Sequence, residues 1–169
     1  TTAAMTIGVR GRATDYVALA KPRLNLLVVV SAVAGYAMAH GDTTNLAALG
    51  WMVVGTGLVS GGASAINQVM ERDTDGLMRR TRQRPLPDGR LSAVEALAFA
   101  GILSVTGLFV LAAGVNLLSA VVALATLASY AVVYTPLKRR TSFATVIGAI
   151  PGALPPVIGW AAADNALSQ

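Results

Sequence analysis

The sequence contains no cysteine, which excludes disulfide bonds, thiolate metal sites and cysteine nucleophiles. It has a single histidine, His40, so a zinc site built from several histidines is excluded too. Charged residues make up only 12% of the 169 residues, against about 25% in a typical soluble domain. Together with 54% hydrophobic residues and a mean hydropathy of +0.63, this deficit argues against a soluble protein and against a disordered one.

Long stretches of the chain carry no Asp, Glu, Lys or Arg, namely 24–41, 43–70, 96–137 and 141–163. A helix needs about 20 apolar residues to cross the core of a bilayer. The third stretch is long enough for two crossings and divides at 114–116, where we expect a tight turn. The sequence therefore predicts an all-α, polytopic transmembrane helix bundle with five spans, at 18–39, 46–70, 93–113, 117–137 and 142–163.

The 13 lysines and arginines fix the predicted topology, because the five spans place all of them on one side of the membrane. The connections on the opposite side, 40–45 and 114–116, hold none. The positive-inside rule makes the basic side, with the N-terminus, cytoplasmic, which predicts a multi-pass protein of the cell's inner (cytoplasmic) membrane. A net charge of +5 placed in this way suits anionic membrane lipid and argues against a nucleic-acid partner.

A strip of polar side chains follows the second span. Asn67, Glu71 and Asp75 are spaced i, i+4, i+8, which places them on one face of a helix, whereas Asp73 lies nearly opposite Glu71. Mg²⁺ prefers oxygen ligands and is typically held by one or two carboxylates plus substrate phosphates. The strip is therefore a candidate magnesium site. The alternative is that Glu71 and Asp75 form a solvated ion network with the neighbouring arginines.

Several cations and a tyrosine converge on the same membrane face as this strip. An acidic strip surrounded by cations is explained if a polyanion bridges them through a metal, and diphosphate is the obvious candidate. The apolar bundle beside that face would then hold a lipid tail. The converging residues are Lys21, Arg23, Arg80, Arg84, Tyr134 and Lys138.

These motifs resemble the UbiA-type intramembrane prenyltransferase superfamily, which carries Asn-Asp-x-x-Asp-x-x-x-Asp after its second helix. The matching positions here are Asn67, Gln68, Glu71 and Asp75, with Gln and Glu replacing two aspartates. This variant is similar to the haem O synthase (protohaem IX farnesyltransferase) branch. So are Arg80-Thr-x-x-Arg84-Pro-Leu-Pro, Tyr134-Thr-Pro-Leu-Lys138 and the run 147–160, and the resemblance covers about 15–163.

The resemblance implies an enzyme that transfers a farnesyl group from farnesyl diphosphate to a vinyl group of haem b, with Mg²⁺ as cofactor. It implies catalytic and metal-binding roles for Asn67, Glu71 and Asp75. Arg80 could instead serve the ion network around Asp75. Oligomeric state is left open. The diphosphate ligands that it implies are Arg23, Arg84, Tyr134 and Lys138.

The resemblance also implies about nine helices and a second Asp-rich motif after the sixth. Here only Asp164 is acidic after Glu95. We therefore expect residues 1–169 to form a single transmembrane prenyltransferase domain that is truncated at its C-terminus.

Two alternatives remain from the sequence. The chain could belong to another prenyltransferase branch, acting on a quinone precursor or a chlorophyll-type acceptor, although Gln68 and Glu71 favour the haem branch. It could also be a fragment of a membrane transporter that binds an anion. A transporter is expected to carry ionisable groups near the membrane midplane, whereas the charge-free stretches leave the midplane empty.

Overall fold

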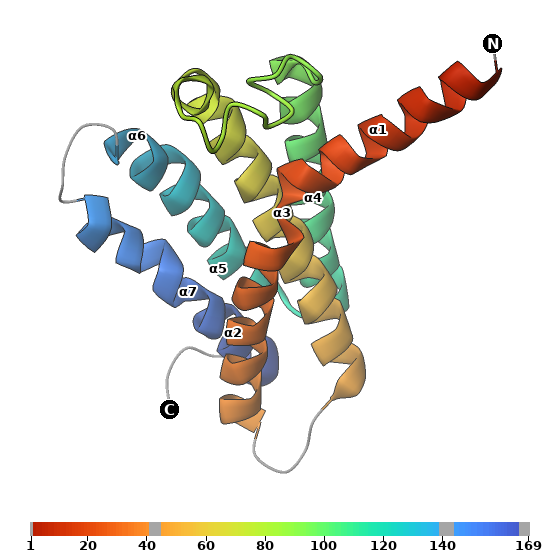
Figure 1. The fold of residues 1–169 in the computed structure, drawn as a ribbon. Helices are drawn as coiled ribbons and strands as arrows, with labels where there is room; N and C mark the ends of the chain where they lie inside the picture. Colours follow the sequence, from red (N-terminus) through yellow and green to blue (C-terminus); the bar gives the residue numbers. More distant parts are fainter. Residues whose placement is uncertain (1, 41–44, 139–143, 166–169) are drawn as a thin grey trace.

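The computed structural model describes residues 2–40, 45–138 and 144–165, with side chains for 11–39, 45–138 and 146–165, and contains helices but no strand within these ranges (Figure 1). The elements are listed in chain order: α1 (Thr2–Ala20), α2 (Pro22–His40), α3 (Leu46–Leu77), α4 (Ala93–Gly114), α5 (Leu117–Ala128), the π-helical turn η1 (Ser129–Tyr134), α6 (Thr135–Leu137) and α7 (Ala144–Asp164).

The five predicted spans are confirmed as helices long and apolar enough to cross a membrane: Pro22–Ala39, Leu46–Leu77, Ala93–Gly114, Leu117–Leu137 and Val146–Asp164. The predicted turn at 114–116 is present, and Asn116 caps α5 by accepting a hydrogen bond from Ser119 N at 2.8 Å. Residues 142 and 143 of the predicted fifth span lie outside the described part of the chain.

The first span starts later than predicted, because the helix is interrupted at Lys21. Lys21 has φ of 47°, in the left-handed region, and Pro22 opens α2 without a backbone N–H. A residue before proline is also disfavoured in the right-handed helical region. Residues 2–20 therefore form a separate helix, α1, which projects away from the bundle in Figure 1.

The second span is longer than predicted, since α3 has 32 residues and ends at Leu77. At 1.5 Å per residue it is about 48 Å long, whereas the bilayer core is about 30 Å thick. The last turns of α3 therefore extend beyond the apolar layer, and they carry the predicted polar strip. The α3–α4 connection, α6 and the start of α7 lie at this same end of the bundle, opposite the start of α3 (Figure 1).

Buried apolar side chains form two clusters at opposite ends of the bundle. The cluster near the polar strip includes Leu19, Ala65 and Leu91, and the far cluster includes Met52 and Leu111. In the far half, α2 and α7 approach so closely that a Cβ on Gly159 would lie 1.8 Å from the carbonyl oxygen of Ala32. Small residues permit this kind of close helix packing in membranes.

Candidate active site

The polar strip of α3 is built as the spacing predicts. Asn67 is 3% exposed, and its Nδ2 donates to Glu71 Oε2 at 2.6 Å, one helical turn further on. Asp75, the next member of the strip, is 6% exposed. Asp73 points away: its side chain is 90% exposed and lies 3.6 Å from Arg72 Nε. The strip therefore presents one face of oxygen-bearing groups toward the bundle.

Lys138 joins this strip from the other side of the site. Its Nζ donates to Asn67 Oδ1 at 2.9 Å and lies 2.5 Å from Glu71 Oε1. The same Nζ lies 5.3 Å from the centre of the Tyr134 ring. The structure thus brings four of the predicted site residues together: Asn67, Glu71, Tyr134 and Lys138.

The backbone that carries Lys138 contains a π-helical turn, η1. Thr135, the residue after this turn, is 1% exposed, and its Oγ1 lies 2.8 Å from Tyr130 O and 3.3 Å from Asn67 Oδ1. π-helical turns inside α-helices occur frequently at functional sites. Here the turn sets the direction in which Thr135 and Lys138 face α3. Sequence reasoning did not single out Thr135.

Asp75 pairs with Arg84, whose Nη1 lies 2.6 Å from Asp75 Oδ2. Thr81 Oγ1 donates to the backbone carbonyl of Asp75 at 2.8 Å, which folds the α3–α4 connection back over the end of α3. The alternative predicted a solvated ion network of Glu71 and Asp75 with the neighbouring arginines. Asp75 does pair with an arginine but is buried, whereas Glu71 pairs with Lys138. Arg80, the other candidate partner of Asp75, is exposed and makes no described contact with it.

Arg90 holds the connection that presents Arg84. Its guanidinium is bonded to Asp15 of α1 and donates to Asp88 Oδ2 at 2.8 Å and to the carbonyl of Gln83 at 2.7 Å. Asp15 is 5% exposed, so this contact is anchored inside the protein. Through Arg90, α1 fixes the loop that brings Arg84 to Asp75.

Lys21 is a member of the site that the sequence analysis placed on this face without a role. Burial lowers the pKa of Lys21 below its ordinary value, the positive charge of Arg84 lowers it further, and Glu71 and Asp75 act in the opposite direction. Lys138 adds a smaller lowering effect. Three cations therefore face two carboxylates, and the excess positive charge favours an anion.

Arg23, which was predicted as a diphosphate ligand, is placed differently. It is exposed on the first turn of α2 and does not line the cavity described below, whereas Lys21 does. The Lys-Pro-Arg sequence made both cations candidates. The sequence feature that distinguishes the two cations is the proline after Lys21. It marks the interruption of the helix that turns Lys21 inward.

Gln68 explains one departure from the superfamily motif. It is 2% exposed, and its Nε2 donates to the carbonyls of Leu19 at 2.8 Å and Ala18 at 3.4 Å. The last carbonyls of a helix lack partners within that helix. An amide can donate to them, whereas an ionised aspartate cannot. At this position Gln68 joins α3 to the end of α1 and faces away from the polar strip.

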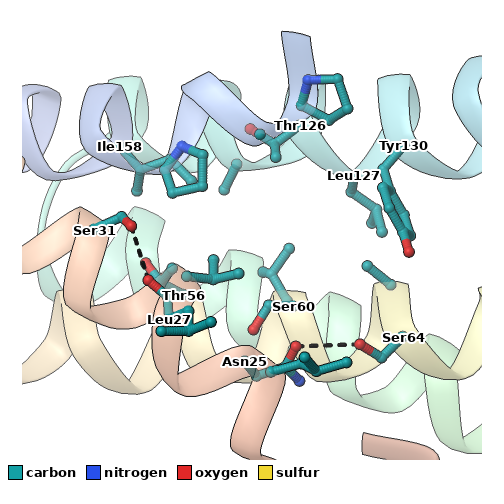
Figure 2. Close-up of a pocket in the computed structure, with 18 of the residues that line it drawn as sticks. Asn25, Leu27, Ser31, Thr56, Ser60, Ser64, Thr126, Leu127, Tyr130 and Ile158 are labelled. Carbon is teal, nitrogen blue, oxygen red and sulfur yellow. Dashed lines mark hydrogen bonds between the residues drawn. The ribbon is translucent and has the colours of Figure 1, made fainter. Parts of the chain in front are cut away.

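A cavity of about 470 Å³ opens from the charged cluster into the bundle. Lys21, Tyr134 and Lys138 line its polar end, and its walls come from α2, α3, α5 with η1, and α7. Figure 2 shows Tyr130 and Ser64 toward one end of this space and Ile158 and Ser31 toward the other. The arrangement offers two lysines at one end, beside the carboxylates of α3, and a largely apolar space beyond them, as an amphiphilic anion requires.

Comparisons with known proteins agree with this architecture. Residues 28–169 match the UbiA prenyltransferase family, and the chain belongs to that family. It is 48% identical over 164 residues to a protoheme IX farnesyltransferase of Solibacter usitatus, covering 92% of this chain and 56% of the relative. A protoheme IX farnesyltransferase of Geobacter sulfurreducens is 53% identical over 148 residues, covering 88% of this chain and 54% of the relative. The chain thus spans about half the length of the curated relatives it matches.

Two solved structures share the fold. A structure described as digeranylgeranylglyceryl phosphate synthase in membranes matches with a TM-score of 0.77 and 18% identity, covering 88% of this chain and 52% of that one. A UbiA homologue from Archaeoglobus fulgidus bound to GPP and Mg²⁺ matches with a TM-score of 0.71 and 22% identity, with the same coverage. The predicted all-α membrane fold and the predicted superfamily are confirmed, and family membership favours a prenyltransferase over a transporter.

Proposed function

We propose that this chain carries the diphosphate-binding part of an enzyme that transfers a farnesyl group from farnesyl diphosphate to a vinyl group of haem b, forming haem O. The observation that carries the proposal is the junction at Lys138. There a cluster of three cations and two carboxylates meets a 470 Å³ cavity that leads away from the charges. The similarity to protoheme IX farnesyltransferases, which cover about 90% of this chain, supports haem b as the acceptor.

The donor set fits Mg²⁺. Asn67, Glu71 and Asp75 offer only oxygen ligands, which suit a hard cation. No group of three or more His, Cys, Asp or Glu side chains that could hold a metal occurs among the residues that the structure describes, so protein carboxylates alone do not complete a site here. One or two carboxylates plus substrate phosphates are the usual way to hold Mg²⁺.

When bound, Mg²⁺ would neutralise negative charge on the diphosphate oxygens. Lys138 and Arg84, which now pair with Glu71 and Asp75, lie where they could turn to diphosphate oxygens. We propose that Lys21 and Tyr134 complete this set at the cavity mouth and that Arg23 lies outside it. Charge-assisted bonds of this kind are roughly twice as strong as neutral ones.

In the proposed reaction, the bond between C1 of the farnesyl chain and the diphosphate oxygen breaks, and the diphosphate leaves with the electron pair. The haem vinyl group attacks C1, water adds to the resulting cation and loses a proton, and a hydroxyethylfarnesyl group remains. Preorganised cations stabilise the charge that develops on the leaving group. The mechanism requires no covalent protein nucleophile, in agreement with a sequence that contains no cysteine.

The test is to supply the full-length protein in membranes with haem b and farnesyl diphosphate and to follow haem O by mass. We expect haem O to form with Mg²⁺ and to disappear when EDTA removes the metal. Release of diphosphate with a quinone precursor but not with haem b would assign the protein to another branch. Haem O formation that persists in EDTA would contradict the magnesium proposal.

We further propose that the charged end of the bundle faces the cytoplasm, on the basis of the one-sided cations. A single cysteine introduced as Arg82→Cys, in a background without other cysteines, tests this orientation because Arg82 is exposed in the α3–α4 connection. We expect a membrane-impermeant maleimide to label it only in inside-out vesicles. Labelling from the outer side of intact cells would reverse the topology.

A further inference from the structure

One buried carboxylate lies outside the polar strip and outside the cavity. Asp15 of α1 is 5% exposed, and an ionised carboxylate is tolerable inside a protein only when it is paired. Its partner is the guanidinium of Arg90 in the α3–α4 connection, 75 positions further along the chain. The ion pair therefore joins α1 to the connection that carries Arg84.

Arg90 organises the backbone on both sides of Arg84. Its Nη2 donates to Gln83 O at 2.7 Å, and its backbone N–H donates to Pro85 O at 2.9 Å. Its Nε donates to Asp88 Oδ2 at 2.8 Å, and the backbone N–H of Asp88 donates to Arg84 O at 3.0 Å. A displacement of Arg90 would therefore be transmitted to Arg84 through several hydrogen bonds.

The α1 helix is itself fixed to the rest of the protein at its C-terminal end. Gln68 of α3 donates to Leu19 O at 2.8 Å. Leu19 is fully buried and belongs to the same apolar cluster as Leu86 and Leu91 of the connection. Lys21, which lines the mouth of the cavity, follows α1 directly. The same short helix thus adjoins one cation of the site and supports the loop of another.

We propose that α1 supports the diphosphate site and that Asp15 is a positioning residue, which acts on a bound prenyl diphosphate through Arg90 and Arg84. This inference rests on the proposed function, because it takes Arg84 to bind diphosphate. A misplacement of about 1 Å caused far from the chemistry can cost about 100-fold in rate. Without the Asp15 carboxylate, Arg90 loses its ion pair with α1, and the direction of Arg84 is held less well.

The experiment is a double-mutant cycle in the full-length protein, with the affinity for farnesyl diphosphate measured in the presence of Mg²⁺. Asp15→Asn keeps the size of the side chain but removes its charge, and we expect the affinity to fall about tenfold, as is usual when a supporting contact is lost. In an Arg84→Ala background, the same substitution should cause no further loss, because the residue through which it acts is gone. Equal losses in the two backgrounds would overturn the inference.

Arg12→Gln is the matched control. Arg12 forms the other ion pair of α1, with its Nη2 3.8 Å from Glu95 Oε1, but this pair is exposed and leads to α4 and not to the connection. Its loss should leave the affinity unchanged. If Asp15→Asn fails to fold, Arg90→Lys decides the question in the same cycle, since lysine keeps the charge but lacks the guanidinium fork that reaches both Asp15 and Gln83 O.

A measurement without ligand separates this inference from the proposed function. Local opening is reported by hydrogen exchange of backbone amides. We expect the amides between residues 81 and 90 to exchange faster in Asp15→Asn than in the unmodified protein or in Arg12→Gln. Unchanged exchange together with unchanged affinity would overturn the role of Asp15. If the unmodified protein binds no farnesyl diphosphate, the proposed function fails, whereas faster exchange would still show that Asp15 holds the connection.

Discussion

The two halves of α3 share one helical face but present different chemistry on it. In the far half, Met52 and Val59 are buried among apolar neighbours. In the half that leaves the membrane, Asn67 and Asp75 are equally buried but bonded to Lys138 and Arg84. Burial of a polar group is tolerable only when it has partners. Packing therefore controls one half of the helix, and charge pairing controls the other.

The largest effect should come from removing charge in the polar half. In the full-length protein, Asp75→Asn removes a carboxylate of the proposed Mg²⁺ site, and we expect turnover to fall about 100-fold or more because the metal that neutralises the leaving diphosphate is held less well. Membrane insertion should be unchanged. Asp73→Asn is the matched control, because Asp73 is 90% exposed on the opposite face and should have little effect. Near-normal turnover of Asp75→Asn at low Mg²⁺ would contradict the assigned role.

The apolar end of the bundle, where the far half of α3 lies beside α2 and α7, should respond to substitution with a loss of stability and no change in the reaction. Gly159→Ala places a Cβ 1.8 Å from the carbonyl of Ala32, so α2 and α7 must separate. We expect overpacking to cost about 1–3 kcal/mol of unfolding free energy, measured by thermal unfolding in detergent. Gly101→Ala is the control, because its Cβ would meet nothing within 4 Å. Equal stability of the two variants would show that the helix contact is looser than described.

A change where the two halves of α3 meet should also reduce stability. Gln68→Glu keeps the size of the side chain but replaces the donor that serves Leu19 O and Ala18 O. Leaving buried carbonyls without a donor costs about 1–3 kcal/mol. We expect the melting temperature to fall relative to the exposed control Gln83→Glu. A variant as stable as the unmodified protein would show that α1 is held by other contacts.

The smallest effect concerns pH. Burial and the charge of Arg84 lower the pKa of Lys21 in the free protein, and a bound diphosphate would raise it again. The contribution of Lys21 to binding is therefore fully present below its free pKa and is lost as pH rises through its bound pKa. We expect prenyl diphosphate affinity to weaken on the alkaline side, and less so in Lys21→Arg. Identical pH profiles for both proteins would remove Lys21 from the site.

Much of the fold could be predicted because membrane spans appear in the sequence as long stretches without charged residues. A count of apolar residues alone ends the second span at residue 70, because the charged residues Glu71 and Arg72 follow. The helix continues to Leu77 because, outside the apolar layer, its polar residues find partners on the neighbouring connection. Composition alone contains no information about those partners.

The site residues divide in the same way, into those placed by the geometry of one helix and those placed by contacts between helices. The i, i+4 spacing predicted that Glu71 shares a face with Asn67 and Asp75 and that Asp73 does not, since this depends on the helix alone. The positions of Lys21 and Gln68 depend on where α1 ends against α3, a contact between residues about 50 positions apart. The roles assigned to Arg23, Arg84, Tyr134 and Lys138 stay predictions until diphosphate binding is measured.

The π-helical turn at Ser129–Tyr134 has a consequence for insertions and deletions in this gene segment. Such a turn holds one residue more than an α-helical path of the same length. Deleting one residue from this turn would leave a regular helix of the same length, so the residues that follow would keep their direction. Deleting one residue from the regular helix before it, α5, would instead rotate everything that follows by about 100° about the helix axis. Thr135 and Lys138 would then turn away from Asn67, although no site residue had been exchanged. The π-helical turn is therefore the one place in this span where the length of the chain can change by a residue without moving the lysine.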